Sequence, residues 1–436
     1  MTEALLLIII EDNQSFCNKY YSVHLTVYHI LYCKERTIGE RKWIFLNSFI
    51  YVVLCFVYIC NNHNPQSPNA MLYTYLKDIK DLKERKRTIE GLTRLRDQLD
   101  AEIPKKTAER TLLLATWNIR QFTDNRKQES YLYIAEILSR FDLIAVQEVK
   151  DTMKGLEKVK SILGKNWAYI ATDVSEESGG NYERIAFLYD TNKVSFKNVA
   201  GEIVLPNTEL IQGMQFARTP FCVAFQAGWF KFYLTTVHIF YGTGSEEEFE
   251  RREKEISAIG TFLSRRAKKE DTSYIILGDF NIPDVGDRYM NALEDSGFFI
   301  PKDIKEHPTN FGKEVKHYDQ IAFNLHLEDG VEILKKDVKH SGAFDFTQSV
   351  YRDQDYEQYI DVMPEKDLKE KDPETGKKKT EKRTGAAAKT YFHSTYRIGQ
   401  MSDHMPLWVE LNVDFSNKYI EKQMEYIKSK EAEAAK

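Results

Sequence analysis

The chain has 436 residues, of which 42% are hydrophobic and 29% are charged, so it is long enough for one to three domains with a buried core. This composition is close to that of an average globular protein and excludes a wholly disordered chain, a collagen and a multi-span membrane protein. The 61 basic and 66 acidic residues give a net charge of −5, which argues against a general basic coat for nucleic acid but permits a local basic cleft.

Residues 1–70 form an N-terminal segment that contains a candidate membrane span. Residues 43–60 carry no charge and are long enough for one helix to cross the hydrocarbon core of a bilayer. Basic residues precede this run, and the next basic residue after it, Lys77, follows much later. The positive-inside rule would therefore anchor the chain with its main part outside the cytoplasm. The alternative is that residues 1–70 do not belong to the working protein, because Met71 opens a segment of different character; the main part would then be cytoplasmic.

Residues 71–104 predict an amphipathic helical segment. Apolar residues recur mostly at three- and four-residue steps from Leu76 to Leu99, with charged residues between them, until Pro104 interrupts the pattern. The first interpretation is a helix that packs on the following domain. The second is a coiled-coil arm, against which Lys86 counts because it interrupts the apolar seam.

Residues 111–414 change to short β-rich runs separated by charged, glycine, proline or asparagine residues. Many of these runs are apolar on both faces, and we expect helices between them over 128–140, 151–163, 245–269 and 287–296. Such alternation with buried strands predicts packed sheets that are covered by helices.

Two further segments differ from this pattern. Residues 364–389 are densely charged and contain two prolines, which predicts a solvated, mobile insertion or, as the alternative, a loop that contacts phosphate. Residues 415–436 predict a polar helical tail at the C-terminus.

Polar and ionisable side chains recur where the apolar runs begin or end. A bare carboxylate is costly inside a strand, whereas strand ends are rigid places at which sites are assembled. Any one of these residues alone would be read as a turn former, but the whole set predicts one shared cleft. The set comprises Asn118, Glu148, His238, Asp279, Asn281, Asp319, Asp403 and His404.

A family resemblance covers most of the chain, from Leu112 to Leu411. The segments TWNIRQF, AVQEVKD, NYERIAFLYD, FARTPF, TTVHIFYG, LGDFNIPD, YDQIAF and MSDHMPLWVEL, in this order, resemble the endonuclease/exonuclease/phosphatase superfamily. QEVKD, the ERxAFLYD strand and a histidine at position 238 are most similar to the deoxyribonuclease I-like branch. The resemblance implies an α/β (α+β) fold: a four-layer αββα sandwich of two packed mixed β-sheets, here with an N-terminal helical extension, and a site at the top of both sheets.

The resemblance also implies a divalent cation. It makes Glu148 the main metal ligand, with Asn118 and Asp403 helping to shape the metal and phosphate site. Mg²⁺ prefers hard oxygen ligands and is held by one or two carboxylates together with substrate phosphate, so this set suits Mg²⁺ or Mn²⁺ better than zinc. Ca²⁺ would be a structural ion.

Two histidines each have a carboxylate partner by the same resemblance: His238 with Glu183 and His404 with Asp319. A carboxylate bonded to one ring nitrogen fixes the tautomer and raises the basicity of the other nitrogen. We assign His404 as the base that activates water and His238 as the acid that protonates the leaving oxygen. The reverse assignment of the two histidines stays open, and Asp279 is the alternative base.

The remaining candidates would contact substrate. Asp279 and Asn281 would hold the water and a phosphate oxygen, and the planar guanidinium of Arg218 would contact a phosphate. Asn118 belongs to the same phosphate site, and Tyr182 would line the substrate path.

These residues predict a divalent-metal-dependent phosphodiesterase, with DNA as the first candidate substrate, because a narrow basic patch suffices to follow a nucleic acid backbone. The alternative, suggested by the candidate span, is a phosphoesterase that acts on a phospholipid headgroup, similar to a sphingomyelinase, or on a soluble phosphate ester. A binding module on an inactive scaffold is a third interpretation, and the occupied catalytic positions argue against it. The sequence indicates no obligate protein partner.

Overall fold

The computed structural model describes residues 71–175, 181–242, 244–312, 314–326, 341–371 and 378–434. The candidate membrane span at residues 43–60 lies outside this part of the chain. Within it, no helix combines the length and the apolar character that a bilayer crossing requires.

Two mixed sheets form the centre of the described chain. In each sheet one neighbouring pair of strands is parallel, β1 with β2 and β7 with β8, and the other pairs are antiparallel. The first sheet has the order β10 (Ser341–Ala343), β13 (Leu407–Asn412), β1 (Thr111–Phe122), β2 (Leu143–Lys150), β4 (Glu183–Asp190), β3 (Trp167–Ala171). The second has the order β5 (Val194–Glu202), β6 (Phe221–Ala227), β7 (Phe230–His238), β8 (Ser273–Asp279), β9 (Asp319–Asn324).

The two faces of the first sheet bury different apolar clusters. Successive side chains of a strand point to opposite faces, so Leu112 and Leu114 of β1 join the core shared with the second sheet, whereas Leu113 and Trp117 join the core under the helices. Strands that are buried on both faces need apolar residues at every position, which explains the unbroken apolar runs in the sequence.

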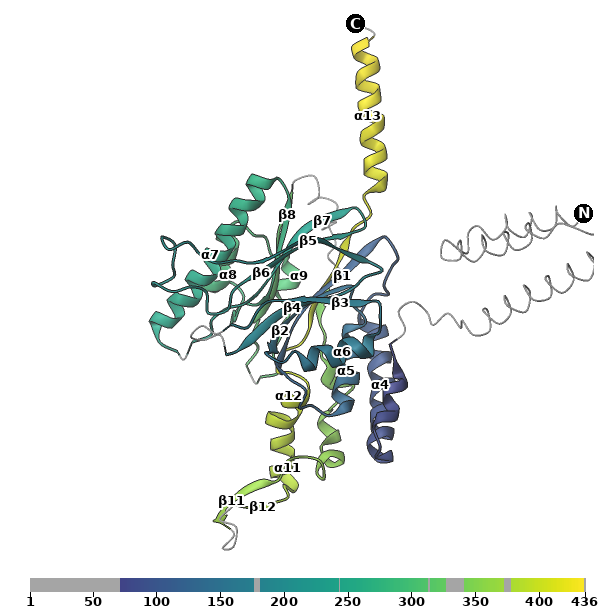
Figure 1. Cartoon of the computed structure of the whole chain (residues 1–436), viewed down its shortest axis with the longest axis vertical. Coiled ribbons are helices and arrows are strands. Elements are labelled where there is room, and N and C mark those ends of the chain that lie inside the picture. The colour runs from purple at the N-terminus through teal and green to yellow at the C-terminus, as the bar shows by residue number, and fades with distance from the viewer. Residues whose placement is uncertain are drawn as a thin grey trace, which may run out of the picture. The chain divides into compact units, whose positions relative to one another are not determined.

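Helices cover the outer faces of both sheets (Figure 1). Helices α4 (Leu82–Glu102), α5 (Gln128–Leu138) and α6 (Lys154–Leu163) contribute to the cluster of the first sheet, and α7 (Glu246–Glu270) and α8 (Arg288–Asp295) contribute to that of the second. The predicted αββα sandwich is therefore confirmed. Helix α4 buries Leu92, Leu95 and Leu99 in the same cluster as β1, so it packs on the domain that follows it.

The charged segment and the C-terminus have their own local structure. Strands β11 (Lys366–Lys371) and β12 (Lys378–Glu381) pair as an antiparallel hairpin where the sequence indicates a mobile insertion. The helices α9 (Lys302–Lys305), α11 (Gly385–Tyr391) and α12 (Arg397–Gln400) are short, and α13 (Ser416–Ala434) has no buried residue.

Strand register brings three of the candidate residues side by side. His238 at the end of β7 pairs with Asp279 at the end of β8, and Asp279 pairs in turn with Asp319 at the start of β9. Residues that pair across neighbouring strands present their side chains on the same face of a sheet. The second sheet alone therefore aligns a histidine and two carboxylates.

The glycine that precedes Asp279 permits this close packing. Gly278 has a φ of 136°, and a Cβ atom on it would lie 2.1 Å from the Val237 carbonyl oxygen of the adjacent strand. Both the backbone conformation and the neighbouring backbone therefore require glycine.

The substitution Gly278→Ala is expected to lower the free energy of unfolding by at least about 2 kcal/mol, through a backbone clash and a strained φ. The matched control is Gly201→Ala in β5, where an added Cβ would meet open space. Chemical denaturation of both variants measures this, and equal stability of the two would contradict the argument.

Candidate active site

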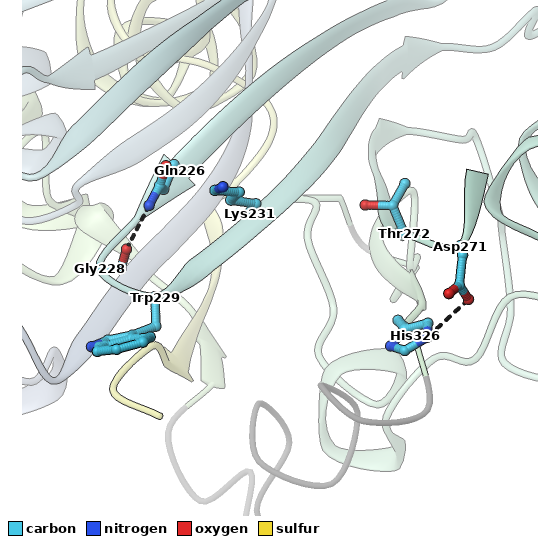
Figure 2. A pocket seen from close by; sticks show the side chains of 7 residues that line it. All are labelled: Gln226, Gly228, Trp229, Lys231, Asp271, Thr272 and His326. Atoms are coloured by element: carbon cyan, nitrogen blue, oxygen red, sulfur yellow. Dashed lines mark hydrogen bonds and ion pairs between the residues drawn. The ribbon is translucent and has the colours of Figure 1, made fainter. Parts of the chain in front are cut away.

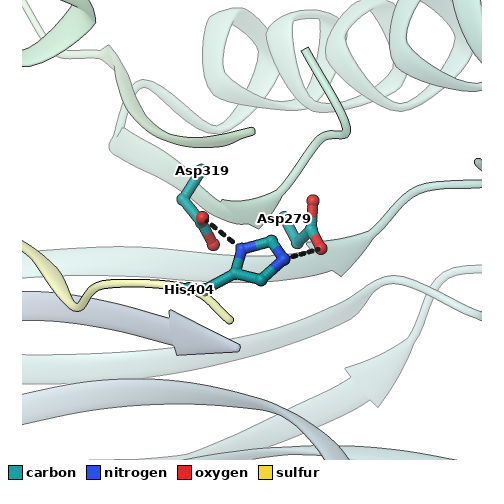
Figure 3. Close-up of side chains that lie close together, drawn as sticks. All are labelled: Asp279, Asp319 and His404. Carbon is teal, nitrogen blue, oxygen red and sulfur yellow. Dashed lines mark hydrogen bonds and ion pairs between the residues drawn. The ribbon is translucent and has the colours of Figure 1, made fainter. Parts of the chain in front are cut away.

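Asp279 lies at the centre of the candidate site. One of its oxygens, Oδ2, lies 3.6 Å from Nε2 of His238 and 3.8 Å from Nε2 of His404. The Nδ1 atom of His404 lies 2.7 Å from Asp319 Oδ2, so His404 is held between two carboxylates (Figure 3). His238 is bracketed in the same way, because its Nδ1 lies 3.3 Å from Oε2 of Glu183.

The predicted histidine and carboxylate pairs are therefore both present in the geometry. Their side chains are buried, and each carboxylate contacts the ring nitrogen that faces away from Asp279. This arrangement fixes how each imidazole is oriented and directs both Nε2 atoms toward the same carboxylate.

The first sheet supplies the next contacts. Asn118 Nδ2 donates to Oδ2 of Asp279 at 2.9 Å and to Oε1 of Glu148 at 3.1 Å, so one amide joins the two sheets. Glu148 lies where the pairing of β2 with both neighbouring strands shifts register, and its φ is 59°. Such a bulge re-aims a side chain, here toward Asn118 and toward the backbone N–H of Gln121, which donates to Glu148 Oε2 at 2.8 Å.

These residues fit a divalent cation. Asn118 Oδ1 is buried and has no hydrogen-bond partner among the described residues, while Nδ2 of the same amide contacts the carboxylate of Glu148. An unpartnered buried oxygen beside a carboxylate is the hard donor chemistry that Mg²⁺ and Mn²⁺ prefer. Asp279, Asp319 and His404 also offer ligand atoms within 4.8 Å of one another, but the bond between Asp319 and His404 already uses one atom of each.

The other predicted contacts have different surroundings. The carboxylate of Asp403 pairs with Arg120 at 2.6 Å and its side chain is 36% exposed, so it lies at the rim. Arg218 is buried, and its Nε donates to Glu183 at 2.9 Å. Tyr182, which directly precedes Glu183 in the chain, is 66% exposed.

Asn281 forms hydrogen bonds within the protein through both its backbone and its side chain. Its N–H donates to Asp279 Oδ1 at 2.9 Å, and its Nδ2 donates to the carbonyl of Ile239 at 2.7 Å. With a φ of 54°, Asn281 turns the chain sharply after β8. It therefore positions Asp279 and ties the segment after β8 to the segment after β7.

Three supporting residues were missed from the sequence. Arg252 donates to the carbonyls of Phe240 and Asn281, at 3.1 and 3.0 Å, and so clamps the segments after β7 and β8. The sequence contained a signal for Arg252, because this residue occupies a position of the apolar stripe of α7, four residues before Ile256. A charged residue at such a position indicates a buried side chain with a specific partner. Arg126 and Ser402 hold the segment after β1 to the segment around His404, and both lie in loops that carry no periodic signal.

Burial and charge at the site shift the pKa values of Glu183 and His404. Burial opposes the ionisation of Glu183, but the hydrogen bond and charge of His238 and the charges of Arg218 and Lys150 outweigh it and lower the pKa to about 2. Burial alone would lower the pKa of His404, but the charges of Asp319 and Asp279 raise it to about 10. The two carboxylates therefore favour the protonated form of His404.

A separate hollow lies at the other end of the second sheet (Figure 2). Trp229 and Thr272, which line it, stand just before the first residues of β7 and β8, whereas His238 and Asp279 end these strands. Its lining residues are Gln226, Gly228, Trp229, Lys231, Asp271, Thr272 and His326. None of them was a candidate, so this hollow is distinct from the site around Asp279.

The sequence matches a family model and two deoxyribonucleases. The family model described as the endonuclease/exonuclease/phosphatase family matches residues 115–363, more than half of the chain. A deoxyribonuclease of Thioalkalivibrio sp. (strain K90mix) is 30% identical over 181 residues, which cover 39% of this chain and 46% of that protein. Deoxyribonuclease gamma of Rattus norvegicus is 27% identical over 256 residues, which cover 55% of this chain and 78% of that protein.

Among solved structures, an endonuclease/exonuclease/phosphatase family protein from Bacteroides thetaiotaomicron is similar to this chain with 16% identity and a TM-score of 0.42. The alignment covers 70% of this chain and 99% of that one. The match to the first of the two deoxyribonucleases spans less than half of that relative's length.

The pKa of Glu183 predicts how stability depends on pH. The folded pKa of about 2 lies below the ordinary value, so the ionised carboxylate stabilises the fold above about pH 4.5, and this contribution is lost as the pH falls through 2. Glu183→Gln is expected to lower the free energy of unfolding by about 3 kcal/mol at pH 7 and by clearly less at pH 3. Urea denaturation at both pH values tests this, and a deficit that grows toward low pH would contradict it.

Proposed function

Since this chain belongs to the endonuclease/exonuclease/phosphatase family, we propose that it is a divalent-metal-dependent phosphodiesterase that hydrolyses DNA. One observation carries the proposal: two imidazoles, each held by its own carboxylate, direct their Nε2 atoms at Oδ2 of Asp279, at 3.6 and 3.8 Å. Hydrolysis of a phosphodiester needs a base for water, a proton for the leaving oxygen and neutralisation of charge on the phosphate. The cluster offers a group for each task.

Asp279 is the base in this proposal. Its Oδ1 is occupied by the N–H of Asn281, while Oδ2 faces both imidazoles and the amide of Asn118. A water held at Oδ2 would transfer its proton there as its oxygen attacks phosphorus. His238, oriented by Glu183, gives a proton to the oxygen that leaves when the phosphorus–oxygen bond breaks.

His404 serves as a donor rather than as the base. Its pKa is raised to about 10 by Asp319 and Asp279, so the protonated form is favoured. A protonated imidazole cannot accept a proton from the attacking water. The imidazolium donates a hydrogen bond to a non-bridging phosphate oxygen and offsets the charge that develops there. This assignment takes up the alternative in which Asp279 replaces His404 as the base.

A divalent cation at Glu148 and Asn118 would supply Lewis-acid stabilisation of the phosphate when bound. The basic side chains of Arg120 and Lys150 pair with Asp403 and Glu183, two carboxylates of the candidate site, and would contact the phosphodiester backbone. Both curated relatives described above are named deoxyribonucleases, which supports DNA over the phospholipid and soluble-ester alternatives.

The proposal predicts nicking of plasmid DNA with Mg²⁺ or Mn²⁺ and loss of nicking with EDTA. His238→Ala should lower kcat by roughly 10²- to 10⁴-fold, the range of general acid catalysis. His404→Ala should lower it by roughly 10²- to 10³-fold, the range for loss of one donor that stabilises charge in the transition state. His326→Ala is the matched control, because His326 pairs with Asp271 at the opposite end of β8 and should retain full activity.

Retention of nicking by either active-site variant would contradict the catalytic assignment. Hydrolysis of sphingomyelin or an inositol phosphate by a preparation that leaves plasmid DNA intact would replace DNA with the phosphoester alternative.

The role of His404 is tested by the pH dependence of kcat/KM. Because its protonated form is the active one and its pKa is raised to about 10, kcat/KM should fall as the pH rises toward that value. His404→Asn should lose this alkaline limb. An ascending limb that disappears in His404→Asn would instead identify His404 as the base.

A further inference from the structure

A row of aromatic rings leads from the surface to His404. The ring of Tyr318 lies 5.6 Å from that of His404, at an interplanar angle of 34°. The ring of Tyr241 lies 6.4 Å from that of Tyr318 and is nearly perpendicular to it, at 86°. Tyr241 is 55% exposed, so the row begins in solvent and ends on a catalytic imidazole.

The exposed ring of this row, Tyr241, packs against a buried arginine. The guanidinium of Arg252 lies 4.9 Å from the centre of the Tyr241 ring, and Arg252 itself is only 4% exposed. Arg252 also donates to the backbone carbonyls of Phe240 and Tyr241, so the segment that carries the ring is fixed. A supported, exposed ring is preorganised for a ligand at little cost in conformational entropy.

Position is what distinguishes Tyr241 from other exposed aromatic residues. Trp229, for example, is 52% exposed, but its ring contacts that of Tyr419 of α13 at a tilt of 35°, and it lies at the far end of β7. Tyr241 follows His238 by three residues and reaches His404 through Tyr318. Because Tyr318 contacts the ring of His404 and His404 faces Asp279, the two rings flank the place at which a phosphodiester would bind.

We propose that Tyr241, whose ring meets that of Tyr318 edge to face, forms a stacking platform for a nucleobase next to the scissile phosphate, so that the enzyme selects unpaired DNA over duplex DNA. This inference rests on the proposed function and deepens it. An unpaired base can stack on a protein ring without breaking a base pair, whereas a base in a duplex must first be unstacked and unpaired at a cost in free energy. Stacking on the ring adds affinity to that of the contacts with the phosphate backbone.

The test compares three substrates with Mg²⁺: a single-stranded oligonucleotide, the same sequence as a duplex, and the same strand with abasic residues at its centre. Wild-type kcat/KM should be highest for the single strand. Stacking is worth roughly 1–3 kcal/mol per base, so Tyr241→Ala should lower kcat/KM for the single strand by about 5- to 150-fold, chiefly through a higher KM, and should lower it less for the other two. Tyr241→Phe keeps the ring and should restore the preference, and Trp229→Ala should match the wild type.

Two results would overturn the platform: a wild-type preference for duplex, or a Tyr241→Ala effect that is equal for all three substrates. Binding separates this inference from the proposed function. A fluorescent oligonucleotide titrated in EDTA should bind Tyr241→Ala more weakly than Tyr241→Phe even if no cleavage occurs with metal. Absence of cleavage refutes the nuclease, whereas equal binding by the two variants refutes the platform.

Discussion

Polar groups that are buried where the two sheets meet must bond to one another, and the site depends on this constraint. Asn118 of the first sheet donates to Asp279 of the second at 2.9 Å. Thr116 lies two residues before Asn118 on β1, and Thr236 lies two residues before His238 on β7. The hydroxyls of both accept a hydrogen bond from the amide of Gln147, at 3.0 and 2.9 Å. A lost bond here would cost roughly 1–3 kcal/mol for a neutral group, and more for a charged one. These bonds hold the sheets in one register, which brings the ends of β1, β2, β7 and β8 together.

Three residues around the site have a strained backbone. Gln121, Glu148 and Asn281 all have a positive φ without being glycine, and each is bonded to a carboxylate of the site or is itself that carboxylate. A left-handed residue of this kind costs of order 1–3 kcal/mol and persists only where its surroundings hold it. Here the buried guanidinium groups of Arg126 and Arg252 bind the carbonyls of the same loops. The strain therefore serves to aim side chains that a regular strand would direct elsewhere.

The sequence predicted the sandwich and the strand ends, because both depend on short-range patterns. Apolar runs mark buried strands, and His238, Asp279 and Asp319 each end or begin such a run, so their shared edge followed from sheet geometry. The contacts between side chains could not be predicted in the same way. The pairing of Asp403 with Arg120 and the clamp formed by Arg252 result from competition among charges distant in the sequence, which leaves no periodic signal. The candidate span at residues 43–60 stays a prediction.

The central claim is that residues from both sheets act as one metal and phosphate site, and a crystal soaked in Mn²⁺ tests it most directly. An anomalous difference map should show a strong peak within bonding distance of the Glu148 carboxylate and Asn118 Oδ1, beside the two histidines. A peak at the distant hollow beside Asp271, or no peak from a protein whose activity EDTA abolishes, would contradict the account.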